Sequence, residues 1–430
     1  MLSVLLASAA LQQPNLAVTP ERVLLTLTDN PDRQTVVSWR SKSENLAGQG
    51  QIVKGSPDPR SVANPKSVDA TGTTVKVGTD TYTYYTVKFT DLEPGTEYAY
   101  RVGSPTAPDK KQAWSEWIHF KTAKSEVAPF SFIYFGDAQN DLKSLWSRTI
   151  RRACRDMPYA DFMMHAGDLV NVGDRDSEWG EWFYAGGWVH GSIPCLATPG
   201  NHEYARDPQD STKRALTYLW KPQFNYPANG VPGLESTNYV IDYQGARIIS
   251  LNSNEKIKEQ TAWLDKTLSQ NPKKWTFVTF HHPVYSTAAG RDNKTVRDEW
   301  QPILQKHKVA IVLQGHDHTY GRRNVPTGVT GTDPKSGTVY VVSVSGPKMY
   351  RLGAEVEKDM PRVAEYTQLY QLIRVMPDKV RFEAYTITGD LYDAFELTKN
   401  RDGSNHFKDL APKTPNRKEA AAAAKQSGGN

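Results

Sequence analysis

Five short polar clusters between residues 136 and 318 contain the residue types most suited to metal chemistry, and each follows an apolar run. They are Gly136-Asp137-Ala138-Gln139, Gly167-Asp168, Gly200-Asn201-His202-Glu203, His281-His282-Pro283 and Gly315-His316-Asp317-His318. Their carboxylates, amides and imidazoles form a mixed oxygen and nitrogen set that suits Zn, Mn or Fe better than Mg or Ca. With one bridging carboxylate and an open water position, such a set is able to hold two cations about 3.5–4 Å apart.

The apolar runs that precede the clusters read as buried strands. They alternate with helical stretches, which indicates βαβ units, and they are Phe130–Phe135, Asp161–Met164, Ile193–Thr198, Trp275–Phe280 and Val309–Gln314. In a mainly parallel sheet the C-terminal strand ends line one rim, where ligands bind. Glycine at four of the turns allows the sharp bends that a crowded rim needs. We therefore expect the five clusters to converge.

Residues 20–123 have a different texture, with short alternating strands separated by Pro, Gly, Asp and Asn. This spacing without a helical period predicts an antiparallel β-sandwich. The run Leu92–Tyr98 resembles the turn before a late strand of fibronectin type III domains, and Trp39 occupies a position for a buried core aromatic. The sandwich is expected to be a structural spacer, with a carbohydrate- or partner-binding module as the alternative.

After the fifth cluster the pattern becomes antiparallel. The strands Thr338–Val344, Tyr370–Val375, Val380–Tyr385 and Leu391–Leu397 are predicted to add an antiparallel second sheet. Residues 401–430 lack periodicity and end in an Ala run and Ser-Gly-Gly, which predicts a disordered tail.

The five clusters, in this order and spacing, are similar to the motifs of the calcineurin-like metallophosphoesterases. The preceding sandwich and the run Gly315–Tyr320 resemble purple acid phosphatases in particular, and the resemblance covers most of residues 20–400. It implies an all-β sandwich domain (20–123) followed by an α/β domain (129–400) with two packed mixed β-sheets, flanking helices and a βαβαβ core. It also implies a phosphoric ester hydrolase that uses two divalent or trivalent metal ions, with Fe, Zn and Mn favoured.

The resemblance also implies roles for individual residues. Asp137 and His318 look like ligands of the first metal ion, and Asp168 resembles the carboxylate that bridges both ions. Asn201, His281 and His316 look like ligands of the second ion. His202 resembles the catalytic acid that protonates the leaving oxygen. His165, His282 and Asp317 are expected to have structural or ligand-supporting roles.

The sequence departs from the family pattern around the first metal ion. Purple acid phosphatases carry a metal-binding Tyr where this chain has Asn171, and the wider family has His where this chain has Gln139. The first site therefore lacks one strong donor, and the amide of either Gln139 or Asn171 is available to replace it. The plant enzymes also carry a His pair after the fourth motif, and here Arg291 and its neighbours occupy that loop.

These features predict hydrolysis of phosphate monoesters by a metal-bridging hydroxide, with His202 as the acid. Two alternatives remain open at this point. The same core serves phosphodiesterases, and a non-enzymatic secreted binding protein would result if the first metal site had decayed.

Composition sets further bounds. The net charge of +5 without any Lys/Arg-dense stripe fits a small phosphate-ester substrate and does not indicate a specific nucleic-acid partner. Residues 1–19 are predicted to be a signal peptide and lead-in, which implies a secreted or periplasmic protein, and no run is long enough to span a membrane. The two cysteines, Cys154 and Cys195, are expected to be buried free thiols, with one disulfide as the alternative.

Overall fold

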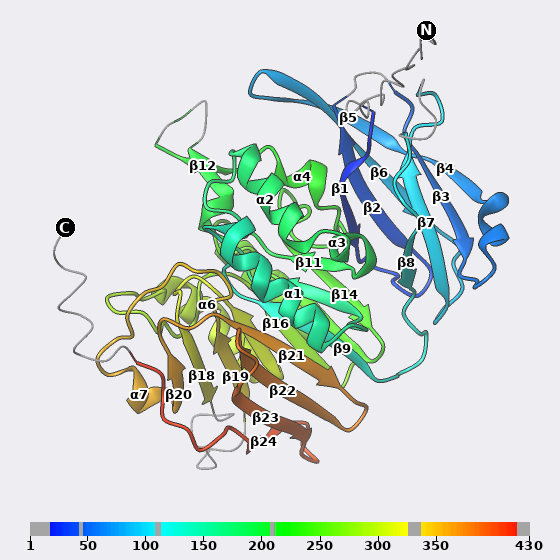
Figure 1. Cartoon of the computed structure of the whole chain (residues 1–430). Helices are drawn as coiled ribbons and strands as arrows, with labels where there is room; N and C mark the ends of the chain where they lie inside the picture. Colours follow the sequence, from blue (N-terminus) through cyan, green and yellow to red (C-terminus); the bar gives the residue numbers. More distant parts are fainter. Residues whose placement is uncertain are drawn as a thin grey trace, which may run out of the picture.

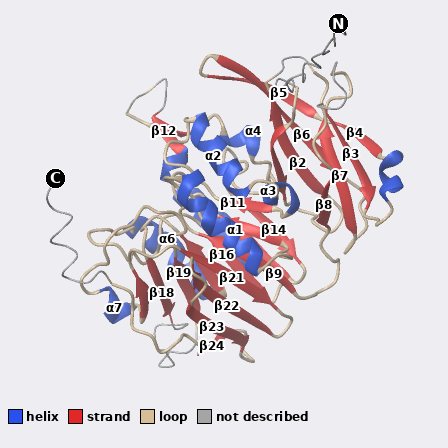
Figure 2. Ribbon diagram, in the orientation of Figure 1, coloured by secondary structure: helices blue, strands red, loops and turns tan. Residues whose placement is uncertain are grey.

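The computed structural model describes residues 18–42, 46–107, 113–206, 210, 212–325 and 337–418. The predicted signal segment therefore lies almost entirely outside the described residues. Within them, two regions are evident in Figures 1 and 2: a β-sandwich at the N-terminal end and a larger region of sheets and helices.

The N-terminal region is a sandwich of two four-stranded layers, ordered β5-β6-β2-β1 and β4-β3-β7-β8. The strands are β1 Glu21–Thr26, β2 Thr35–Ser41, β3 Gln49–Lys54, β4 Lys66–Asp69, β5 Thr71–Val77, β6 Asp80–Phe89, β7 Glu97–Gly103 and β8 Ile118–Lys121. Trp39 stacks on Tyr85 in the core between the layers, with ring centroids 5.2 Å apart. The hydroxyl of Tyr98 accepts a hydrogen bond from the Glu93 amide at 2.8 Å, which fixes the turn before β7.

One layer of the sandwich continues into the second region. Thr26 of β1 pairs in parallel with Cys195 of β11 (Cys195–Ala197), and the result is a single sheet of eleven strands. Its other members are β9 Phe130–Phe135, β10 Phe162–His165, β21 Leu369–Val375, β22 Lys379–Thr386, β23 Leu391–Lys399 and β24 Asn405–Asp409. Polar contacts reinforce this junction, since Asp176 binds both Arg22 and Arg40 at 2.7 Å.

The second sheet of the larger region has seven strands in the order β14-β15-β16-β17-β19-β18-β20. They are β14 Tyr239–Tyr243, β15 Ala246–Ser250, β16 Trp275–Thr279, β17 Ile311–Gln314, β18 Tyr320–Val325, β19 Thr338–Val342 and β20 Arg362–Ala364. The two sheets pack face to face, and the rings of Phe132 and Phe277 meet edge to face with centroids 5.3 Å apart. Strands β9, β16 and β17 are mostly apolar and almost entirely buried because both of their faces are covered.

Helices cover the outer faces of both sheets. On the first sheet lie α1 Ser147–Asp156, α2 Asp176–Gly186 and the short α3 Val189–Ser192 (Figure 1). On the second sheet lie α5 Ile257–Ser269 and α6 Lys294–Lys306, which bury Leu264 and Trp300 against Phe280. The remaining short elements of the described residues are α4 Trp220–Gln223, α7 Val356–Asp359, β12 Tyr204–Arg206, β13 Arg214–Leu216 and the helical turns η1 Pro59–Ala63, η2 Leu142–Trp146 and η3 Asn201–Glu203. The α/β region thus has helix, sheet, sheet and helix layers, and its sandwich-then-α/β architecture is the one expected from the sequence.

Two sequence predictions need correction. The late strands do not form a second sheet of their own: β21, β22 and β23 extend the first sheet beside β9, whereas β19 runs parallel to β17 in the second. The stretch after residue 400 is ordered as far as residue 418, because β24 pairs with β23 and buries Phe407. The predicted tail beyond residue 418 lies outside the described residues.

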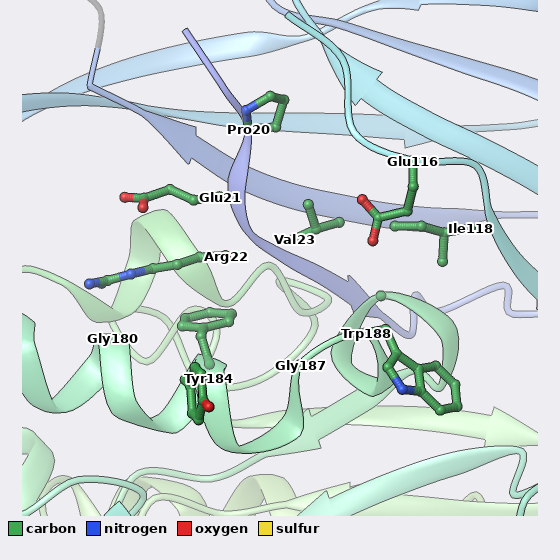
Figure 3. Close-up of a pocket in the computed structure, with 12 residues that line it drawn as sticks. Pro20, Glu21, Arg22, Val23, Glu116, Ile118, Gly180, Tyr184, Gly187 and Trp188 are labelled. Atoms are coloured by element: carbon green, nitrogen blue, oxygen red, sulfur yellow. The ribbon is translucent and has the colours of Figure 1, made fainter. Parts of the chain in front are cut away.

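A pocket of about 410 Å³ lies where the sandwich meets α2 and α3 (Figure 3). Glu21 and Glu116 come from the sandwich side, and Tyr184 and Trp188 from the helical side. None of its lining residues belongs to the five polar clusters.

Both cysteines are buried and free, as predicted. No helix among the described residues has the length and apolar character needed to cross a membrane.

Candidate metal centre

The five polar clusters meet at one edge of the two packed sheets. Three follow β9, β10 and β11 of the first sheet, and two follow β16 and β17 of the second. The sequence pattern suggested the rim of one sheet, whereas the structure joins the C-terminal strand ends of two. The turns are tightly packed: a Cβ on Gly200 would lie 2.1 Å from Oδ1 of Asp168, and one on Gly315 would lie 2.1 Å from Oδ1 of Asp137.

Three of the candidate ligands have left-handed backbone conformations. Asp168, His316 and His318 have φ values of 49°, 76° and 51°. Such values cost a non-glycine residue on the order of 1–3 kcal/mol, and they cluster at functional sites where the surroundings enforce them. The strain here turns the side chains of Asp168, His316 and His318 toward a common centre.

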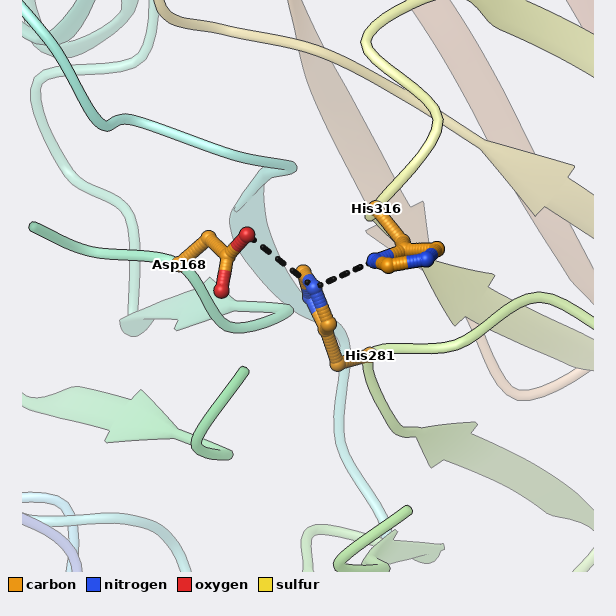
Figure 4. Close-up of side chains that lie close together, drawn as sticks. All are labelled: Asp168, His281 and His316. Carbon is orange, nitrogen blue, oxygen red and sulfur yellow. Dashed lines mark hydrogen bonds and ion pairs between the residues drawn. The ribbon is translucent and has the colours of Figure 1, made fainter. Parts of the chain in front are cut away.

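One group of potential ligands contains Asp168, His281 and His316 (Figure 4). Nε2 of His281 lies 3.2 Å from Oδ2 of Asp168 and 3.1 Å from Nδ1 of His316. Oδ1 of Asn201 completes the group, at 3.1 Å from His281 and 2.9 Å from His316. The ring of His281 is held in place because its Nδ1 donates to the Ala166 carbonyl at 2.9 Å, which leaves Nε2 directed at the group.

A second group contains Asp137, Asp168 and His318. Nε2 of His318 lies 3.2 Å from Oδ2 of Asp137, and its Nδ1 donates to the Lys348 carbonyl at 3.0 Å. The amide of Gln139 joins this group, with Nε2 at 3.2 Å from Oδ2 of Asp168 and 2.9 Å from Nε2 of His318. Asp168 therefore belongs to both groups.

Asp137 and Asp168 each use one carboxylate oxygen to accept a backbone hydrogen bond and direct the other at the ligand groups. Oδ1 of Asp137 accepts from the His316 amide at 2.7 Å, and Oδ1 of Asp168 accepts from the His202 amide at 2.9 Å. The other oxygen of Asp137, Oδ2, is buried and has no hydrogen-bond donor. An ionised oxygen buried without a partner is costly, and a cation between the two carboxylates would remove that cost. The donor set therefore fits a pair of metal ions that share Asp168.

The electrostatics of the cluster agree with this arrangement. Burial alone would lower the pKa of His281, but Asp168 and Asp137 raise it to about 9. Burial raises the pKa of Asp137 to about 7, since the nearby His281 offsets only part of the effect. Burial lowers the pKa of His318 to about 3. Asp168, and Asp137 once it is ionised, thus create a negative field at the positions where the imidazole nitrogens converge.

His202 lies beside the two groups. Its Nδ1 donates to the Asn171 carbonyl at 2.5 Å, so its Nε2 faces the centre at 3.9 Å from Oδ2 of Asp168. The side chain is 25% exposed, in contrast to the buried carboxylates, so a bound molecule is able to reach it. This is the position that a proton donor to a departing oxygen needs.

The segment 346–350 was not among the predicted site residues, although it contributes to the centre. Nζ of Lys348 lies 3.4 Å from Nε2 of His202, and the ring of Tyr350 packs on His318 with centroids 4.7 Å apart. Arg291 packs over Tyr350 at 4.7 Å and donates to the His316 carbonyl at 2.7 Å. A signal was present, because Gly346-Pro-Lys348 follows the apolar run Thr338–Val344 as the other clusters follow theirs.

Other polar residues near the clusters have supporting positions. Both oxygens of Glu203 accept backbone hydrogen bonds from the turns at residues 168–170 and 200, so this carboxylate is not available as an acid. Asp317 accepts from the Thr287 amide at 2.5 Å, and His282 contacts Ser253 at 2.8 Å. His165 packs on Phe135 with ring centroids 5.2 Å apart.

Each of the two regions matches the model of a known protein family. Residues 130–320 match the family model of the calcineurin-like phosphoesterases, and residues 20–122 match that of the purple acid phosphatase N-terminal domain. Residues 130–320 are therefore a calcineurin-like phosphoesterase domain, and they follow a domain of the kind found at the N-terminus of purple acid phosphatases.

Individual relatives are distant in sequence. Purple acid phosphatase 1 of Ipomoea batatas is 25% identical over 421 residues, and the match covers 90% of this chain and 82% of the length of that relative. An uncharacterized protein of Mycobacterium tuberculosis is 25% identical over 357 residues, covering 71% of this chain. The chain spans only 63% of that relative's length.

Solved structures share the fold. The purple acid phosphatase PPD1 from yellow lupin (Lupinus luteus) seeds superposes with a TM-score of 0.76 at 18% identity, covering 90% of this chain and 75% of its own. The structure of PhoD gives a TM-score of 0.69 at 13% identity, covering 96% and 97%.

Proposed function

We propose that this protein hydrolyses phosphate monoesters at a dinuclear metal centre. The observation that carries the proposal is the double membership of Asp168, whose Oδ2 faces both groups of potential ligands. Asp137 and His318 would hold the first ion, and Asn201, His281 and His316 the second. Bound there, the two ions would supply a water of lowered pKa and would neutralise charge on the phosphoryl oxygens.

The chain's own residues have distinct parts in the proposed reaction. His202 is held by the Asn171 carbonyl so that Nε2 points at the centre, and from this atom it protonates the leaving oxygen. The ammonium of Lys348 lies next to that atom and binds a phosphoryl oxygen. Asp168 and Asp137 orient the turns that carry His202 and His316 through backbone hydrogen bonds.

Lys348 supports a monoester as the substrate in preference to a diester. A monoester has two negative charges near neutral pH and a diester has one, so an ammonium adjacent to the centre favours the monoester. Arg291 lies on the His316 side, but its guanidinium is 3.7 Å from Oδ1 of Asp317, so most of its charge is balanced there and Lys348 carries the argument. No carboxylate in the contacts of Lys348 neutralises it within the described residues.

A hydrolysis panel tests the proposal. The metal-depleted protein is reconstituted with Zn, Mn or Fe and assayed on an aryl monoester, the matching diester and pyrophosphate. Hydrolysis that requires metal and is faster on the monoester supports the proposal. A faster diester reaction would assign a phosphodiesterase, and metal binding with no turnover on any ester would favour a binding protein.

We also propose that the protein is exported. The apolar run of residues 2–10 ending in small side chains supports this location. N-terminal sequencing of protein from the culture medium or periplasm tests it, and an unprocessed cytoplasmic product would contradict it.

A further inference from the structure

We infer that the side-chain oxygen of Gln139 is the ligand that completes the first metal position, and that this position is built for a divalent cation preferring oxygen donors, such as Mn²⁺. The inference rests on the proposed dinuclear function and adds the donor that the family's own pattern leaves missing in this chain. It also distinguishes the two metal positions from each other.

Gln139 is fully buried and its amide reaches the metal-facing atoms directly. Its Nε2 lies 2.9 Å from Nε2 of His318 and 3.2 Å from Oδ2 of Asp168, whereas its Oε1 has no hydrogen-bond partner. A buried amide oxygen without a partner costs on the order of 1–3 kcal/mol. Oδ2 of Asp137 is also without a partner in the same cluster.

The orientation of the amide depends on what lies between these atoms. The two ends of an amide have the same shape, and their order follows the surrounding hydrogen-bond network. With no cation, the NH₂ group of Gln139 donates to the acceptors of Asp168 and His318. With a cation between them, a half-turn of the amide directs Oε1 at the ion and removes its unsatisfied state.

Asn171, the alternative donor, makes its contacts near the site through its backbone. Its amide nitrogen donates to Glu178 at 2.7 Å, and its carbonyl accepts from His202 at 2.5 Å. Both contacts belong to the backbone, which holds the His202 ring. Among the described residues no hydrogen bond joins the side-chain amide of Asn171 to Asp168 or His318, whereas the amide of Gln139 contacts both. Gln139 is therefore the better candidate for the first position.

The two positions then differ in donor type. The first has oxygens from Asp137, Asp168 and Gln139 with one nitrogen from His318. The second has oxygens from Asp168 and Asn201 with nitrogens from His281 and His316. Oxygen-rich sets suit harder divalent ions such as Mn²⁺, and imidazole-rich sets suit Zn²⁺ or Fe²⁺. Because Gln139 and neutral His318 add no negative charge, the first position compensates a divalent ion better than a trivalent one.

Metal stoichiometry and affinity of the full-length protein test the inference without reference to activity. Gln139→Leu removes the donor at similar volume, Gln139→Glu keeps an oxygen and adds charge, and Asn171→Ala is the matched control. Each variant is depleted with a chelator, titrated with Mn²⁺ and followed by elemental analysis and electron paramagnetic resonance.

Wild type is expected to bind two equivalents with a coupled dinuclear Mn²⁺ signal. Gln139→Leu should bind one equivalent with an isolated Mn²⁺ signal, its first-site Kd raised by about 100-fold or more, beyond the 10–100-fold typical of supporting residues. Gln139→Glu should keep both equivalents with a lower first-site Kd, and Asn171→Ala should behave as wild type. Gln139→His should shift first-site preference from Mn²⁺ toward Zn²⁺ by about 10-fold or more.

Three results would overturn the inference. They are wild-type Mn²⁺ affinity in Gln139→Leu, loss of one equivalent in Asn171→Ala, and no gain of Mn²⁺ affinity in Gln139→Glu. The last remains decisive if Gln139→Leu does not fold. An unchanged Mn²⁺ to Zn²⁺ preference in Gln139→His would refute the oxygen-donor part. Failure of the proposed function would differ, since a protein with two metal ions but no hydrolysis leaves the role of Gln139 intact.

Discussion

Nζ of Lys348 lies 3.4 Å from Nε2 of His202, so a fixed positive charge and an imidazole face the same approach to Asp168. The two side chains come from segments 146 residues apart in the sequence. Their proximity suggests a division of labour, in which Lys348 binds a phosphoryl oxygen and His202 serves the leaving oxygen.

Removing the charge of Lys348 should affect monoesters selectively. Lys348→Met is expected to lower kcat/KM for nitrophenyl phosphate by about 10–100-fold, as a charge-assisted contact in a partly enclosed site contributes about 1.5–3 kcal/mol. The loss on bis-nitrophenyl phosphate should be much smaller, and Lys348→Arg should retain most of the activity. Lys358→Met, on exposed α7, is the matched control. Equal losses on both esters would contradict a charge-selective role.

The role of His202 depends on the leaving group. His202→Ala should slow hydrolysis of an alkyl phosphate by about 10²–10⁴-fold, because an alkoxide needs a proton to depart. Nitrophenolate is stable as an anion, so nitrophenyl phosphate should be affected much less, with metal content unchanged. Equal slowing of both substrates would indicate that the imidazole binds phosphate, and loss of metal would indicate that it is a ligand.

Asp168→Asn should abolish turnover in a protein that remains folded. The amide oxygen still accepts from the His202 amide, but the negative charge shared by the two ligand groups is lost. Steady-state kinetics and circular dichroism together check this outcome. More than about a tenth of wild-type turnover, a loss below about 1.4 kcal/mol, would reject the bridging assignment.

The iron-loaded protein should lack the visible tyrosinate–ferric band. Asn171 replaces the Tyr of purple acid phosphatases, and the hydroxyls of Tyr204 and Tyr320 donate to Glu255 at 2.5 Å and to Asp393 at 2.6 Å. An absorption spectrum after iron loading checks this. A purple preparation would direct attention to Tyr350, which packs on His318, and Tyr350→Phe would then bleach the colour.

Stability should fall on acidification through a buried histidine away from the metal centre. Burial lowers the pKa of His190 to about 4, and its ring stacks on Trp182 with centroids 4.0 Å apart. The unfolded chain has a histidine pKa of about 6.5, so below that pH it binds a proton that the folded state excludes. Because of His190, the free energy of unfolding should therefore fall by about 2 kcal/mol between pH 7 and pH 5.

Urea unfolding at the two pH values measures this difference. His190→Gln removes the titrating ring and should reduce the difference by about 2 kcal/mol. An unchanged pH dependence in the variant would mean that the His190 ring is protonated in the fold.

The sequence predicted the strands and motifs well where one local signal was sufficient. The runs before Asp137, His281 and His316 are mostly apolar because both faces of their strands are buried, and this is visible in the sequence itself. The assignment of late strands to sheets was wrong, because pairing partners depend on contacts such as Leu372 with Ile133, which lie far apart in the chain.

The sequence predicted which candidate ligand residues lie close together, and it predicted less of what surrounds them. Asp, Asn and His at strand ends have few competing explanations when five such clusters occur in order. Lys348 was overlooked because a single lysine in a loop is usually solvated, and only the three-dimensional contact with His202 distinguishes it. The role of Glu203 was equally hidden, since its hydrogen bonds go to backbone groups 33 to 35 residues earlier and to its own turn.

Because β1 pairs with β11, the sandwich also covers a strand edge that would otherwise be open. In a truncated protein that began at residue 129, β11 would become an edge strand with open backbone groups, and such edges recruit strands of other molecules. The same strand leads into the turn that carries Asn201 and His202, so disorder at that edge would reach the candidate site. The sandwich thus covers the β11 edge against self-association, and a shortened form of the protein would need a substitute for β1.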